Sequence, residues 1–256
     1  MERVYAFMKI ALCLSGGLRN FKDTQYSFQE YLLSTHDVDV FFYGLENRDG
    51  SEINRQDLEQ LYHPKISVVN NQQYYDSIPC PYHLPSAYYA FYNIYMCNEL
   101  KKQYEIKNGF KYDLVIRSRT DCFWFRYIRE QEFELAKHNI MIPADWAFKG
   151  VNPYARSDMF AFGNSELMDS YSLMFTRLKE YTDTIGMFHP ESICGYHLLL
   201  NNIPNIENER CFVFEYPSRR TEKYIHPYKH IKHFDEPDIK NEELFLKTVS
   251  DKRKTF

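Results

Sequence analysis

The sequence predicts an α/β fold in which helices flank a mostly parallel, doubly wound sheet. The run IALCLS, residues 10–15, is continuously apolar and ends at Gly16-Gly17, a pattern typical of a strand buried on both faces. A long amphipathic stretch after Pro85 precedes a second short apolar run inside YDLVIRSRTD, residues 112–121. A helix between two buried strands is the crossover that joins parallel neighbours, so the two runs are expected in one sheet.

The other elements of the first half alternate in the same order. We expect a helix over about 24–33 capped by Asp23 or Thr24, a strand over 38–43, a polar helix over about 54–62 and a strand over 65–69. The helix after Pro85 is expected to be capped by Ser86 and to stop at Gly109. Its apolar face consists of Ala87, Phe91, Ile94 and Tyr95.

The second half predicts strands over 139–143 and 157–163, then a helix capped by Asn164 or Ser165. The segment HPES, residues 189–192, opens a further helix with Pro190 in its first turn, and a late strand is expected over 211–216. We expect one domain over residues 1–256, with a first half of about 1–125, a second half of about 126–235 and a charged C-terminal helix or tail over 236–256.

Composition excludes several classes of protein. The net charge of −4 gives no general attraction to nucleic acid or anionic membranes. No run approaches the roughly 18 apolar residues that a membrane span needs, and the N-terminal apolar stretch is interpreted as a strand rather than a signal peptide. The cysteines contain no CxxC pair, which favours reduced thiols and a cytoplasmic location; they are Cys13, Cys80, Cys97, Cys122, Cys194 and Cys211.

Charged and glycine residues gather at the ends of two predicted strands. Arg117, Arg119 and Asp121 follow one buried run, and Ser15-Gly16-Gly17 with Arg19 closes the other. Ligands of doubly wound sheets bind beyond the carboxyl ends of the strands. Buried charges need partners, so these either pair with one another to close the strand or bind a charged ligand. A diphosphate fits the second alternative, with Asp121 free to hold a divalent metal. The two glycines either let the backbone approach such a ligand or form a plain turn.

Three further sets of residues are candidates for chemistry. Glu191, in the first turn of its helix, is a candidate general base, although the helix dipole favours a Glu there in any protein. Asp158 either contacts an acceptor hydroxyl or starts a strand with a local hydrogen bond. One of His226, His230 and His233 completes a metal site begun by Asp121, or the three belong to a solvated basic face.

These motifs together resemble a known family. KIALCLSGGLRNF, DVDVFFYG, YDLVIRSRTD, SDMFAFGNSELMDSY and HPESICGYHLL occur in the order seen in GT-A fold glycosyltransferases of bacterial polysaccharide clusters and large DNA viruses, over roughly residues 9–216. The resemblance implies a Rossmann-type sheet that binds a nucleotide sugar (a UDP-, GDP- or dTDP-sugar) and a smaller acceptor-side half. It also implies transfer to a glycan or glycoprotein hydroxyl, in the host cytoplasm if the protein is viral.

The resemblance assigns a role to each candidate residue. Ser15, Gly16, Gly17, Arg19, Arg117 and Arg119 would bind the donor, Asp158 the acceptor, and Glu191 would be the base of an inverting displacement. The family's Asp-x-Asp, which holds Mn²⁺ or Mg²⁺, corresponds to Arg119-Thr120-Asp121, with His226 or His230 as a further ligand. Because Arg119 replaces the first Asp, the enzyme is either metal-dependent through Asp121 or metal-independent. A sugar nucleotidyltransferase and a catalytically inactive carbohydrate-binding protein of this fold remain as alternatives.

Overall fold

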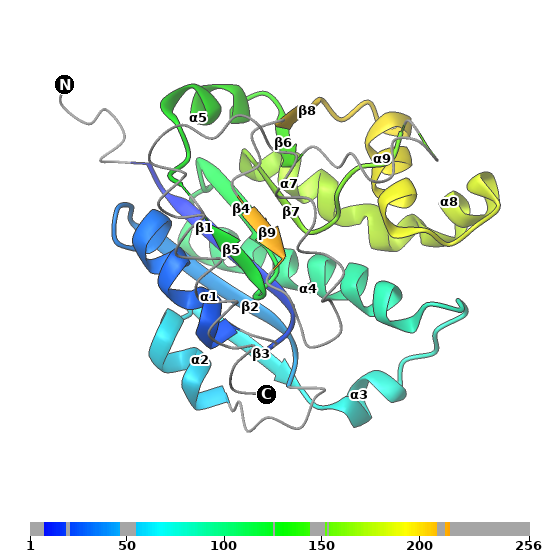
Figure 1. Ribbon diagram of the computed structural model, residues 1–256, viewed down its shortest axis with the longest axis horizontal. Coiled ribbons are helices and arrows are strands. Elements are labelled where there is room, and N and C mark those ends of the chain that lie inside the picture. Colours follow the sequence, from blue (N-terminus) through cyan, green and yellow to red (C-terminus); the bar gives the residue numbers. More distant parts are fainter. Residues whose placement is uncertain are drawn as a thin grey trace, which may run out of the picture.

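The inner strands of the central sheet are apolar on both faces, and their successive side chains pack alternately into two hydrophobic cores. The structure, a computed structural model, describes residues 8–18, 21–46, 55–124, 126–143, 152, 154–208 and 213–215. In β1 (Ile10–Gly17), Ile10, Leu12 and Leu14 pack into one core, whereas Ala11 and Cys13 pack into the other. Because successive side chains of a strand point to opposite faces, a continuous apolar run requires cover on both faces. Helices on both sides provide that cover (Figure 1).

Seven strands form this sheet in the order β3-β2-β1-β4-β7-β6-β8. β3 (Ile66–Asn70), β2 (Val38–Leu45), β1 and β4 (Leu114–Ser118) are parallel neighbours. β7 (Phe160–Gly163) runs antiparallel to both β4 and β6 (Ile140–Pro143), and β8 (Asn205–Asn208) is parallel to β6. The prediction of a mostly parallel α/β sheet is therefore confirmed.

A two-stranded antiparallel sheet lies beside the core that contains Ile10, Leu12 and Leu14. It pairs β5 (Cys122–Trp124) with β9 (Val213–Glu215), which falls inside the predicted late strand 211–216. The same core contains side chains from α1 (Phe21–Phe28), the π-helical turn Gln29–Leu33, α2 (Arg55–Tyr62) and α5 (Glu130–Ala136). The sheet β5/β9 thus extends the cover on one face of the central sheet.

The opposite face of the central sheet is covered by the longest helix. α4 (Pro85–Asn108) buries Phe91, Ile94 and Cys97 against β1 and β2. α7 (Ser165–Ser172), the 3₁₀ turn Leu173–Arg177, α8 (Leu178–Ile185) and α9 (Pro190–Leu200) complete this layer. Among the described helices, none combines the length and the apolar character needed to cross a bilayer.

The helix ends confirm some predicted caps and correct others. Asn164 caps α7 by accepting a hydrogen bond from Leu167 N (2.8 Å), and Gly109 ends α4 in the left-handed region at φ 69°. Ser86 is not a cap, because α4 begins at Pro85 and places Ser86 inside its first turn. Thr24 is not one either: α1 begins at Phe21, and the Thr24 hydroxyl donates to the carbonyl of Thr120 (2.6 Å).

The predicted division into two halves stays a prediction, and the predicted C-terminal tail, 236–256, lies outside the described residues. The cysteines of the described part, Cys13, Cys80, Cys97, Cys122 and Cys194, are free thiols, as the sequence predicted.

Candidate functional site

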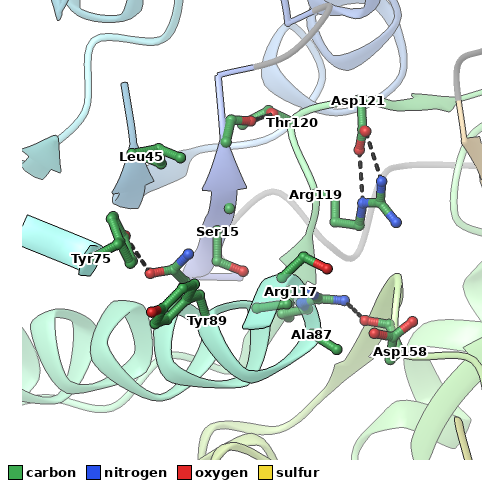
Figure 2. A pocket seen from close by; sticks show the side chains of 15 residues that line it. Ser15, Leu45, Tyr75, Ala87, Tyr89, Arg117, Arg119, Thr120, Asp121 and Asp158 are labelled. Carbon is green, nitrogen blue, oxygen red and sulfur yellow. Dashed lines mark hydrogen bonds and ion pairs between the residues drawn. The ribbon is translucent and has the colours of Figure 1, made fainter. Parts of the chain in front are cut away.

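A pocket of about 360 Å³ lies at the carboxyl ends of the central strands. The strand order 3-2-1-4 makes the junction of β1 and β4 the switch point of the sheet, which is where such folds bind ligands. Figure 2 shows the lining side chains. They come from Ser15, Gly16, Gly17, Leu45, Tyr75, Ser86, Ala87, Tyr89, Ala90, Asn93, Arg117, Arg119, Thr120, Asp121 and Asp158. Apart from Arg19, which lies outside the described residues, the predicted donor-binding residues of both strands share one pocket with Asp158.

The glycine turn at the end of β1 depends on a close approach of two strands. Gly16 has φ +117°, a conformation that residues with side chains rarely adopt, and it pairs in register with Gly44 of β2. A Cβ atom on Gly44 would lie well inside the contact distance of the Gly16 carbonyl oxygen. Glycine at position 44 therefore allows β2 to support the turn that lines the pocket.

We expect Gly44→Ala to lower the free energy of unfolding by about 3 kcal/mol, the upper range for overpacking, because the clashing atom is backbone and cannot rotate away. Urea denaturation measures the loss. Gly163→Ala is the matched control in β7, since its Cβ would meet Asn139 O at 3.2 Å, and it should cost clearly less. Equal losses in the two variants would contradict this interpretation of the β1–β2 contact.

Arg119 and Asp121 pair with each other at the end of β4. Arg119 Nε donates to Asp121 Oδ1 (2.8 Å) and Nη2 donates to Oδ2 (2.7 Å), a bidentate pair. The Asp121 side chain is only 2% exposed, whereas that of Arg119 is 21% exposed. Between them, Thr120 Oγ1 donates to the carbonyl of Gly17 (2.6 Å), which ties the end of β4 to the glycine turn of β1. Arg119, Thr120 and Asp121 together form part of the pocket wall.

Arg117 differs from Arg119 in having no carboxylate partner. The residue is 3% exposed, its Nη1 donates to the backbone carbonyl of Asp158, and its Nε has no hydrogen-bond partner. Across the described residues, no ion pair includes Arg117. A buried cation without a counterion is costly, and this one lines a pocket. The arrangement is suited to binding an anion.

The opposite part of the pocket is neutral and was missed by the sequence analysis. Tyr75 of α3 (Gln72–Asp76) donates its hydroxyl hydrogen to Asn93 Oδ1 (2.6 Å), and its ring packs on Tyr89 with a centroid distance of 5.2 Å. Burial raises the pKa of the Tyr75 phenol, so it stays protonated as a donor. The signal in the sequence was Asn93, a polar residue next to the apolar positions of α4. Ala87 packs against the core, as its assignment to the apolar face predicted, and it also lines the pocket.

Glu191 is not among the residues that line the pocket. It lies in the first turn of α9, where its Oε2 is 3.3 Å from His189 Nε2. The segment that leads to Asp158 runs beside this turn, because Arg156 N donates to the Glu191 carbonyl (2.9 Å). The structure thus places Glu191 next to the segment that leads to Asp158 without bringing its carboxylate to the pocket wall, and its role as base stays a prediction.

The described part of the pocket does not fit a divalent cation. Both oxygens of Asp121, the predicted ligand, accept hydrogen bonds from Arg119, and the described residues contain no group of three His, Cys, Asp or Glu side chains placed to hold a metal. A cation at Asp121 would have to displace the Arg119 guanidinium. The other predicted metal ligands, His226, His230 and His233, lie outside the described residues, as does Arg19, which was predicted to bind the donor.

The fold and the pocket define an α/β protein with a cavity at the switch point of its sheet, lined in part by Arg117 and Arg119. The chain belongs to the family described as Domain of unknown function (DUF7796), whose model matches residues 6–167. That range includes every residue that lines the pocket, from Ser15 to Asp158, whereas Glu191 follows it. No curated protein matches the chain.

Proposed function

We propose that this protein is a glycosyltransferase that moves a sugar from a nucleotide-diphosphate sugar to a hydroxyl of a glycan or glycoprotein. The observation that carries the proposal is Arg117, a buried guanidinium without a carboxylate partner in the described residues, at the pocket where β1 and β4 end. A diphosphate supplies the missing anion. The resemblance of the ordered motifs to GT-A glycosyltransferases supplies the reaction.

The proposed reaction is a single in-line displacement with inversion at the anomeric carbon. The acceptor oxygen forms the new glycosidic bond as the bond from the anomeric carbon to the phosphate oxygen breaks, and the acceptor proton passes to a carboxylate. Arg117 and Arg119 neutralise the departing nucleoside diphosphate. They take the role that a divalent metal has in relatives with Asp-x-Asp, which agrees with the use of both Asp121 oxygens by Arg119.

The assay that tests this proposal compares two substrate sets on the full chain. Release of a nucleoside diphosphate from UDP-, GDP- or dTDP-sugars is expected, and it should increase with an acceptor glycan. Consumption of a nucleoside triphosphate together with a sugar 1-phosphate would instead show a nucleotidyltransferase. Binding of nucleotide sugars without turnover, across acceptors, would show the catalytically inactive alternative.

We expect Glu191→Gln to reduce sugar transfer by about 100-fold or more, because an amide cannot accept the acceptor proton. Binding of the donor should be unchanged, since Glu191 lies away from the pocket lining. Asp158→Asn is the matched carboxylate-to-amide change on the pocket wall. Steady-state transfer rates with both variants decide the assignment: full activity in Glu191→Gln with loss in Asp158→Asn would move the base to Asp158.

A further inference from the structure

The pocket is divided into a charged and a neutral half, and this inference rests on the proposed function. The strand order places Leu45, at the end of β2, and Tyr75, after β3, on one side of β1. Arg117 and Arg119, around the end of β4, and Asp158, before β7, lie on the other. Figure 2 shows Ser15 between the two groups. If the diphosphate binds the arginines, the nucleoside extends toward the neutral half.

The neutral half is shaped for a flat, uncharged ring. Tyr75 and Tyr89 form one wall with their rings at 66° to each other, and Leu45 adds an apolar side chain. Ala87 and Ala90 of α4 leave room because their side chains are small. Aromatic and aliphatic walls of this kind bind a nucleobase through stacking and burial of apolar surface.

Asn93 presents a hydrogen-bond donor to this half. It is 4% exposed, and the hydroxyl of Tyr75 donates to its Oδ1 (2.6 Å), as the dashed line at Tyr75 in Figure 2 marks. Since the phenol donates, the amide is oriented with oxygen toward Tyr75 and Nδ2 away from it. Within the described residues, Asn93 Nδ2 makes no hydrogen bond. This amide lines the pocket, and its unpartnered N–H₂ group is open to a hydrogen-bond acceptor on a ligand there.

We propose that Asn93 makes the pocket select nucleotides whose base presents a carbonyl oxygen rather than an amino group at the edge facing α4. Uracil and cytosine differ at one such position, an oxygen acceptor in uracil and an amino donor in cytosine. The amino group of cytosine would place a second hydrogen-bond donor opposite the Asn93 N–H₂ group, so the two groups could not form a hydrogen bond. Tyr75 acts as a positioning residue, because its hydroxyl fixes the orientation of the amide.

The test is calorimetric titration of the full chain with UDP and with CDP. We expect wild-type protein to bind UDP about tenfold or more tightly than CDP, because the wrong base leaves buried donors unpaired. Asn93→Asp should reverse the ratio, since a carboxylate accepts from the cytosine amino group. Tyr75→Phe should bring the ratio toward one, because the amide is then free to turn. Gln103→Glu, which adds the same charge as Asn93→Asp at an exposed position of α4, is the control.

Each result has a definite consequence. Because the readout is a ratio, a general loss of affinity from the charge of Asn93→Asp cancels, and Tyr75→Phe tests the same contact if Asn93→Asp fails to fold. Equal binding of UDP and CDP to wild-type protein, or a ratio unchanged in both pocket variants, overturns the selection by Asn93 while the proposed function stands. Failure of wild-type protein to bind UDP, CDP, GDP or ADP overturns the proposed function, and the selection with it.

Discussion

Replacing Arg117 with Met is expected to weaken binding of a nucleoside diphosphate by about 100-fold or more, because a charged pair buried in a complex contributes about 2–5 kcal/mol. The variant should fold with unchanged or higher stability in the absence of ligand, because it removes a buried charge that lacks a carboxylate partner in the described residues. Calorimetric titration and urea denaturation measure the two effects. The combination of lost affinity and retained stability is typical of a binding residue.

Arg126→Met is the matched control for that variant. Arg126 is also buried, but its Nη1 and Nη2 donate to the two carboxylate oxygens of Glu132 at 2.9 and 2.7 Å, and it is not among the pocket-lining residues. Its loss leaves Glu132 without this partner and should cost about 3–5 kcal/mol of stability with no change in nucleotide affinity. If Arg117→Met instead loses stability and keeps its affinity, Arg117 is a structural residue and the anion site is wrong.

Asp121→Ala is expected to lower sugar transfer by about 100-fold, comparable to removing one preorganised donor from an active site. The reason is indirect, because Asp121 uses both oxygens to hold the Arg119 guanidinium at the pocket. The double variant Asp121→Ala, Arg119→Ala should therefore be no worse than the poorer single variant, since the two residues act as a unit. Steady-state rates with and without EDTA provide the measurement.

Additive losses in the double variant would separate the two residues, and loss of wild-type activity in EDTA would return Asp121 to a metal-binding role. Unchanged transfer in Asp121→Ala would remove this carboxylate from the site altogether. The three outcomes thus distinguish a positioning carboxylate, a metal ligand and a bystander.

Local pattern was sufficient to predict the part of the site that follows β1 and β4. Both strands are short apolar runs closed by polar or glycine residues, and parallel strands bring such ends together at one edge. The sequence could not show which of two alternatives the charges adopt. In the structure Arg119 pairs with Asp121, which is the first alternative, whereas Arg117 has no carboxylate partner among the described residues. For Arg117, binding of a charged ligand stays a prediction.

The neutral half could not be predicted because it depends on distant contacts. Tyr75 reaches Asn93 only after β3 and α4 have packed on the sheet, and no local pattern specifies that pair. Likewise, β5 has only three residues and pairs with β9 about ninety positions later in the chain. A run this short carries too little local signal to predict a strand. Thr24 was expected to cap a helix, but its hydroxyl bonds Thr120 across the fold.

The most direct measurement is a thermal-shift screen of the full chain with UDP-, GDP- and dTDP-sugars, each with and without Mn²⁺. A ligand of the native state raises the melting temperature in proportion to the logarithm of its concentration above Kd. We expect at least one nucleotide sugar to raise the melting temperature of wild-type protein without Mn²⁺, and to have no effect on Arg117→Met. No shift with any nucleotide sugar, or an equal shift in Arg117→Met, would contradict a donor site at the ends of β1 and β4.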